Sequence, residues 1–140
     1  MKRIAITGGP AQVIARARVA FGGAWSPRGV IVFPPWPSGG LYQIPAGGGS
    51  PKQVTVLDSA RGEFAHCHPA FLPDGRHFLF FAVSARSGES SIRVGSLDST
   101  SSKFLVNADG TAVYGPAPGE HRGFLLFFFR GGHLILMAFN

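Results

Sequence analysis

Apolar β-forming residues occur in short runs along the chain, and each run is bounded by turns rich in proline and glycine. Three of these runs share the same surroundings, since each follows an aromatic residue and a Pro/Gly turn: Val30–Phe33, His77–Phe81 and Phe124–Phe129. The aromatic residues that precede them recur about every 45 residues: Trp25, Phe71 and Tyr114. The pattern therefore predicts a repeated unit made of short strands and tight turns.

A second phrase repeats with an offset of 40 residues. Met1–Ile14 aligns with Leu41–Val54, and both segments read as a strand, a Gly-Gly turn and a return strand. Glycine accepts the positive φ that a tight hairpin turn requires. We therefore expect each of the two segments to form a β-hairpin.

The two repeats together predict units of four antiparallel strands, which is the organisation of β-propeller blades. Under this interpretation residues 1–140 form one all-β segment, a partial β-propeller with two complete four-stranded blades and a partial blade at each end. The predicted boundaries are residues 1–15, 22–58, 67–108 and 112–140. Propellers close with four to eight blades, so we expect this segment to be a fragment of a larger propeller.

The three long apolar runs carry few polar residues to mark a solvent face. Continuous apolar strands are typical of sheets that are covered on both faces. We therefore expect the strands at Val30–Phe33, Phe78–Phe81 and Phe124–Phe129 to lie between neighbouring sheets.

Charge adds a constraint on partners. The net charge is +6, and residues 1–57 hold six basic residues and no acidic one. A basic half could contact nucleic acid. The six bases are scattered through predicted turns and never form a run, so we expect no nucleic-acid partner.

Membrane and export signals are also missing from the sequence. The longest apolar runs, Phe124–Phe129 and Leu134–Phe139, have six residues each, whereas a membrane-spanning helix needs about 20. The segment Met1–Gly9 begins with basic residues but has no apolar core, so we expect no signal peptide. The compartment stays undetermined from these features.

No cofactor or catalytic motif follows from the sequence. Ile4–Gly9 is similar to the strand-Thr-Gly opening of nucleotide-binding folds, but Gln12 and Ile14 stand where such a loop needs glycine. A Gly-x-Ser-x-Gly elbow is also absent. We therefore assign no catalytic and no cofactor-binding residue.

The segment Glu63–His68 carries the greatest concentration of chemically versatile side chains. In a regular strand His66 and His68 would point to the same face and could bind one metal ion, with Glu63 as a third ligand. No second Cys/His pair stands at a known zinc spacing. We therefore prefer a structural role for these residues and assign no metal site, with metal binding as the alternative.

Several of these phrases resemble a known family. Phe71–Phe80 resembles the repeat of TolB-like (WD-repeat-like) β-propellers, and Leu41–Gly48 and Ile92–Asp98 resemble the strand that follows it. The combination of Gly22–Trp25, Leu41–Gly49 and His68–Phe80 resembles the C-terminal propeller of serine/threonine protein kinases from acidobacteria and related soil bacteria.

The resemblance implies an extracytoplasmic propeller that a membrane span joins to a cytoplasmic kinase domain. None of the kinase motifs occurs in this chain, so we expect a non-catalytic interaction or sensory module that binds a protein or peptide through its blade loops. One alternative is a propeller that accompanies a peptidase or hydrolase. Another is a metal binder using His66 and His68. Open blade faces would also favour self-association.

Overall fold

The computed structural model describes residues 1–117 and 123–139 of the chain. Its secondary structure in these ranges is all-β, apart from one 3-10 turn (η1, Ser59–Arg61). The strands, in chain order, are β1 (Lys2–Arg3), β2 (Gln12–Val13), β3 (Ala24–Trp25), β4 (Val30–Phe33), β5 (Tyr42–Pro45), β6 (Lys52–Gln53), β7 (Glu63–Phe71), β8 (His77–Ser84), β9 (Ser91–Ser96), β10 (Ser99–Asn107), β11 (Ala112–Pro116), β12 (Gly123–Phe129) and β13 (His133–Phe139).

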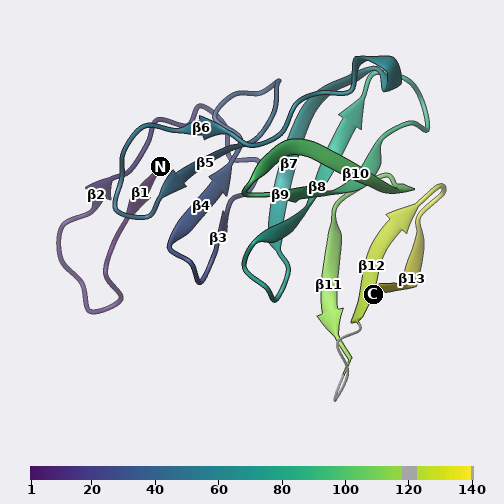
Figure 1. Ribbon diagram of the computed structural model, residues 1–140. Helices are drawn as coiled ribbons and strands as arrows, with labels where there is room; N and C mark the ends of the chain where they lie inside the picture. The colour runs from purple at the N-terminus through teal and green to yellow at the C-terminus, as the bar shows by residue number, and fades with distance from the viewer. Residues whose placement is uncertain (118–122, 140) are drawn as a thin grey trace.

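The strands form four antiparallel sheets, in each of which strands adjacent in sequence are also adjacent in space. We call them the N-terminal hairpin (β1–β2), sheet I (β3–β6), sheet II (β7–β10) and sheet III (β11–β13). They follow one another across the molecule from the N-terminal to the C-terminal end (Figure 1). The prediction of an all-β chain with several antiparallel sheets is confirmed, and none of the sheets is closed.

Strand register reproduces the 40-residue offset seen in the sequence. In the N-terminal hairpin Lys2 lies opposite Val13. In sheet I Tyr42 lies opposite Gln53, and each of these residues stands 40 positions after its counterpart in the hairpin. The two hairpins predicted from the Gly-Gly turns are therefore equivalent in pairing as well as in sequence.

Three apolar clusters lie between consecutive sheets, and each draws on residues from both sides. The first joins the hairpin segment to sheet I, the second joins sheets I and II, and the third joins sheets II and III. Their buried members are Ile14, Ala15, Ile31, Phe33, Ile44 and Ala46 in the first; Val32, Leu41, Val54, Phe78, Phe80 and Ala82 in the second; and Leu79, Ile92, Ala108, Ala112, Leu125 and Phe127 in the third.

The second strand of each sheet explains this arrangement, because successive side chains of a strand point to opposite faces. In β8, Phe78 and Phe80 belong to the second cluster while Leu79 belongs to the third. In β4, Ile31 and Val32 divide in the same way between the first and second clusters. Both strands are therefore covered on both faces, as predicted.

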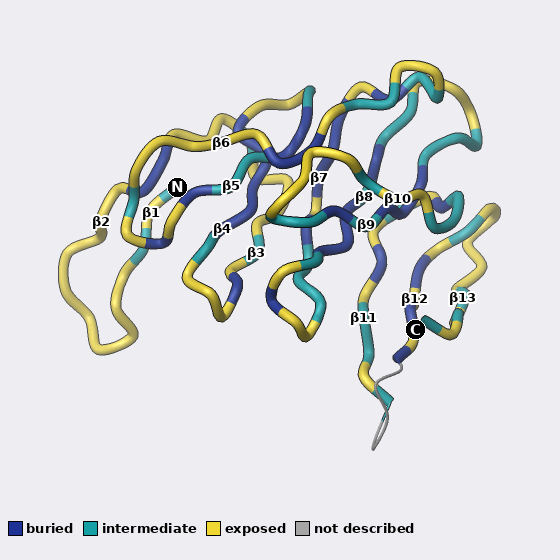
Figure 2. The backbone as a smooth tube through the Cα atoms, in the orientation of Figure 1, coloured by how far each residue is buried: buried dark blue, intermediate teal, exposed yellow. Residues whose placement is uncertain are grey.

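Strand β12 departs from this prediction. Its residues Leu125 and Phe127 are buried in the third cluster, but Phe124, Leu126 and Phe128 are exposed. Exposed positions continue along β13 (Figure 2). Within the described residues no further sheet follows sheet III, so these residues cover only one face of β12. The predicted Pro/Gly turn Gly115–Gly119 extends beyond the described residues.

Candidate functional site

A buried polar network occupies the junction between sheets I and II. It contains Thr55, which follows β6, Glu63 and His66 from β7, and Arg93 from β9. All four are buried, although such residues are mostly found at protein surfaces. Burial without hydrogen bonds would be costly, so the pairing of their polar atoms decides what the network does.

A continuous chain of hydrogen bonds runs through His66. The backbone N–H of Leu41 donates to Thr55 Oγ1 at 2.8 Å. Thr55 Oγ1 lies 2.8 Å from His66 Nδ1, and His66 Nε2 lies 2.9 Å from Glu63 Oε2. An ionised carboxylate only accepts, so Nε2–H donates to Glu63. Burial lowers the pKa of His66 and favours the neutral ring, in which Nδ1 accepts a hydrogen bond from the Thr55 hydroxyl.

Glu63 is held as a carboxylate by three donors. Arg93 Nη1 donates to its Oε1 at 2.6 Å, and the backbone N–H of Asp58 donates to its Oε2 at 2.7 Å. Burial alone would raise the pKa of Glu63, but the hydrogen bonds from Asp58, His66 and Arg93 outweigh it and lower the pKa. Burial lowers the pKa of His66, and the opposing attraction of Glu63 does not compensate.

The order hydroxyl, imidazole, carboxylate is also that of a nucleophile, its general base and an orienting acid. Catalysis would require a substrate to reach Thr55 Oγ1. The Thr55 side chain is 0% exposed and its oxygen already accepts the Leu41 N–H. The arrangement therefore supports a structural role, in which the network fastens sheet I to sheet II.

His68 lies apart from this network. A β-bulge shifts the register of β7 between Cys67 and Ala70, and His68 has a φ of 50°, in the left-handed region. His66 is buried while His68 is exposed, so the two rings lie in different environments. A metal ion shared by the two rings stays a prediction. In the described part of the chain, no three His, Cys, Asp or Glu residues group as metal ligands.

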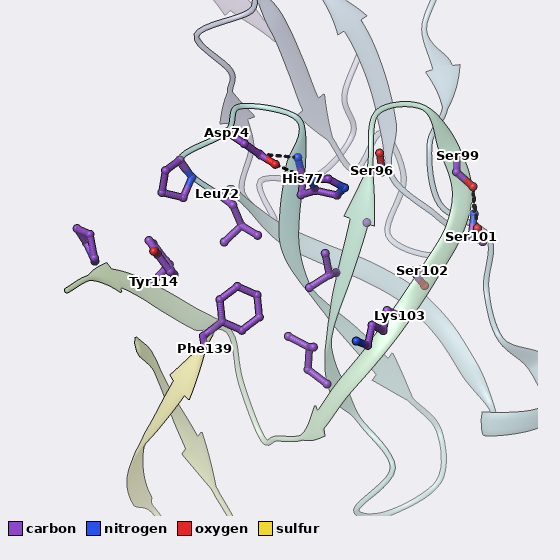
Figure 3. A pocket seen from close by; sticks show the side chains of 15 residues that line it. Leu72, Asp74, His77, Ser96, Ser99, Ser101, Ser102, Lys103, Tyr114 and Phe139 are labelled. Atoms are coloured by element: carbon purple, nitrogen blue, oxygen red, sulfur yellow. Dashed lines mark hydrogen bonds and ion pairs between the residues drawn. The ribbon is translucent and has the colours of Figure 1, made fainter. Parts of the chain in front are cut away.

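The main surface site is a pocket of about 1020 Å³ between sheets II and III (Figure 3). Its apolar wall comes from the end of β7, from β9 and β10, and from the two strands β11 and β13: Leu72, Val94, Leu105, Tyr114 and Phe139. Tyr114 and Phe139 meet edge to face with their ring centroids 6.1 Å apart. This end of the pocket is therefore an aromatic wall.

The opposite wall of the pocket is polar. Strand β10 contributes Ser99, Ser101, Ser102 and Lys103, and a register shift between Ser99 and Lys103 interrupts the regular alternation of the strand there. Among the described residues that line the pocket, Lys103 is the one lysine or arginine. Hydroxyl groups and one ammonium group thus face the aromatic wall across the pocket.

A fixed turn forms the rim of the pocket. The Asp74 carboxylate accepts the backbone N–H groups of Arg76 and His77, both at 2.9 Å, and pairs with His77 Nδ1 at 2.5 Å. Partial burial would raise the pKa of Asp74, but His77 and the two N–H groups lower it to about 2. This turn belongs to the segment Phe71–Phe80, which resembles the repeat of TolB-like β-propellers in sequence.

No local sequence pattern predicts the pocket, because its walls come from strands of two different sheets. Only the turn at Asp74 and His77 belongs to a phrase with a local signal. The serine-rich stretch is part of the long strand β10, and Ser99, Ser101 and Ser102 line the pocket.

The chain matches no protein-family model and no curated protein sequence. Among the described residues, no helix has the length and apolar character needed to cross a membrane.

Proposed function

We propose that the chain is a non-catalytic interaction module built as a segment of a β-propeller. The observation that carries this proposal is the serial packing of its sheets: each apolar cluster lies between two consecutive sheets. Sheets I and II have the same order of four antiparallel strands, and the N-terminal hairpin repeats the register of β5 and β6. Radial repetition of such sheets is how propellers are built.

The binding site of this module is the pocket between sheets II and III. Ligand sites are concave and largely apolar, with a few placed polar groups. An apolar wall that includes Tyr114 and Phe139, opposite the hydroxyl groups of β10, has this character. A short peptide segment fits it, because an apolar side chain packs against the rings while its backbone amides bond the serines.

The buried network supports the non-catalytic part of the proposal. Its hydroxyl-imidazole-carboxylate set lies inside the junction of sheets I and II, with Thr55 fully buried. The module then acts by recognition alone. On the resemblance of Phe71–Phe80 and the neighbouring phrases, we place it in a larger bacterial serine/threonine protein kinase, and we expect a kinase domain in the same reading frame.

A steric block with a matched control tests the pocket. A random peptide-display library is selected on the wild-type chain, and the enriched peptides are measured against Ser99→Trp and Thr100→Trp. Both residues are exposed neighbours on β10, but only Ser99 lines the pocket. We expect Ser99→Trp to weaken binding at least tenfold and Thr100→Trp to leave it unchanged.

Two results would refute this function. One is a set of enriched peptides that bind both tryptophan variants as tightly as wild type, since binding would then lie elsewhere on the chain. The other is the absence of any peptide enriched by the wild-type chain. Circular dichroism of both variants shows that the comparison is made on folded protein.

A further inference from the structure

The pocket between sheets II and III holds a positive charge that no described residue neutralises. Lys103 of β10 lines the pocket and is exposed to solvent. Its ammonium group lies on the side of the strand that faces Phe139 (Figure 3). The ion pairs among the described residues join other side chains and do not include Lys103. A ligand in the pocket therefore meets an ammonium group that is open to a new partner.

Most other polar side chains of the pocket are already hydrogen-bonded within the chain. The Asp74 carboxylate accepts two backbone N–H groups and pairs with the His77 ring. Each of the four lining serines has a hydroxyl partner or another polar partner: Ser96, Ser99, Ser101 and Ser102. In the described part of the chain, the polar side chains of the lining that remain are Lys103 and Tyr114. An ammonium group only donates, and a phenol hydroxyl can donate, so these two groups favour a ligand that accepts.

We infer that the pocket selects peptides in which a carboxylate stands beside an apolar side chain. The carboxylate accepts a hydrogen bond from Lys103 Nζ, while the apolar side chain packs against Tyr114 and Phe139. This inference rests on the proposed function, because it names the chemistry of the peptide that the same pocket takes. The carboxylate belongs either to an aspartate or glutamate side chain or to the C-terminus of the peptide, since an ammonium group recognises the same charge in both.

A carboxylate suits this pocket better than a phosphate group does. Sites for phosphorylated peptides gather arginines, which bind the phosphate oxygens through paired N–H groups. The described lining contains no arginine, and Lys103 acts as a single point charge. The Asp74 carboxylate lies at the rim of the same pocket, and like charges brought together in a binding site are unfavourable. A ligand group with one negative charge is therefore favoured over one with two.

The exposure of Lys103 sets the expected size of the effect. An ion pair at an exposed site changes a binding constant by up to about fivefold. The apolar contacts with the aromatic wall then supply most of the affinity, while the charge decides which peptides are preferred. Because salt screens exposed charges, this preference should shrink as the salt concentration rises.

A cycle of protein variants and peptide forms tests the ion pair. Peptides enriched on the wild-type chain, from a library with free C-termini, are resynthesised in two neutralised forms. One form has glutamine or asparagine in place of each acidic residue, and the other has a C-terminal amide, so the two arms locate the carboxylate. All forms are titrated by fluorescence anisotropy against wild type, Lys103→Met and Lys52→Met. Lys52 is the matched control, because it is an exposed lysine of β6 that does not line the pocket.

The expected result is a coupling between the protein charge and the peptide charge. Lys103→Met should weaken binding of the acidic form about fivefold, the size of an exposed ion pair, and leave binding of the neutralised form unchanged. Lys103→Arg keeps the charge and should keep the preference. Lys52→Met should bind every form like wild type.

Three results would overturn this inference. They are enriched peptides without a carboxylate beside their apolar residue, an equal loss of acidic and neutralised forms in Lys103→Met, and the same loss in Lys52→Met. If Ser99→Trp still blocks binding in any of these cases, the peptide pocket stands and only its charge selectivity fails. If no enriched peptide responds to Ser99→Trp, the proposed function fails and this inference fails with it. The two failures are therefore distinguishable.

Discussion

Strands β8 and β12 are nearly alike in sequence and differ in their surroundings. Both carry a run of phenylalanine and leucine and occupy the second position of their sheets. Sheet I covers one face of β8 and sheet III the other, so Phe80 and Leu79 are both buried. In β12 only one face has a neighbour, and Phe128 is exposed. Burial of an apolar strand is therefore decided by its neighbours and not by its own pattern.

The two junctions of sheet II differ as well. The junction with sheet I contains the buried network around His66 and two further side-chain hydrogen bonds, from Ser26 to the Gly75 carbonyl and from Gln43 to the Leu97 carbonyl. Among the described residues, no buried charged side chain lies in sheet III. One junction thus combines apolar packing with fixed polar pairs, and the other relies mainly on apolar packing.

The largest expected effect tests the comparison of the two strands directly. Phe80→Ala should lower the free energy of unfolding by about 3–5 kcal/mol, because it leaves a cavity between sheets I and II. Phe128→Ala removes the same side chain from an exposed site and should change stability by less than about 0.5 kcal/mol. Urea denaturation at concentrations too low for association measures both. Equal losses would show that β12 is covered on both faces.

The next largest effect on the free energy of unfolding is expected in the buried polar network between sheets I and II. Thr55→Val keeps the shape of the side chain but leaves the Leu41 N–H and His66 Nδ1 without partners, at a cost of about 2 kcal/mol. Thr100→Val, on exposed β10, should cost almost nothing. Urea denaturation of the two variants compares them. A stability loss below about 0.5 kcal/mol for Thr55→Val would mean that the network does not fasten the two sheets.

Much of this fold is predictable from local sequence. The Gly-Gly pairs predicted the hairpins at Met1–Ile14 and Leu41–Val54, and the Pro/Gly turns predicted where β4 and β8 begin. These signals work because a turn's backbone angles depend on the residues within it. The 40-residue offset then matched the observed registers.

Other features depend on contacts that no local pattern records. The bulge after Cys67 gives His68 a positive φ, which the regular alternation of a strand does not predict. The hydrogen bond between Thr55 and His66 connects the segment after β6 of sheet I with β7 of sheet II. The pocket is lined both by Leu105 of β10 and by Phe139 of β13. The exposed face of β12 depends on which sheet follows it. Most of these features are tertiary contacts between different strands or sheets.

The pH dependence of stability should distinguish the two junctions. Burial lowers the pKa of His66 below its ordinary value of 6.5, and the pKa of Glu63 lies below 4.5. The unfolded chain therefore binds more protons than the folded chain in acid, and stability falls as the pH drops through these values. We expect wild type to lose stability from about pH 6.5 downward, by urea denaturation at several pH values.

A variant without the imidazole sharpens this expectation. His66→Gln should be less stable than wild type at pH 8, and its stability should decline less between pH 6.5 and 5. A matched change at exposed His68, His68→Gln, should leave the wild-type pH profile intact. If the two variants have the same profile, His66 is not the group that titrates.

The smallest effect concerns the turn beside the sheet II–III pocket. The Asp74 carboxylate pairs with the His77 ring at a partly exposed turn, and exposed pairs contribute less than about 1 kcal/mol. Asp74→Asn should therefore lower stability far less than Thr55→Val, and the difference from wild type should shrink in 1 M salt, where charges are screened. Because the pKa of Asp74 is lowered to about 2 from 3.8, its contribution is present above pH 4 and lost as the pH falls toward 2. A loss as large as that of Thr55→Val, unaffected by salt, would mean that this turn contributes as much to stability as the buried network at the sheet I–II junction.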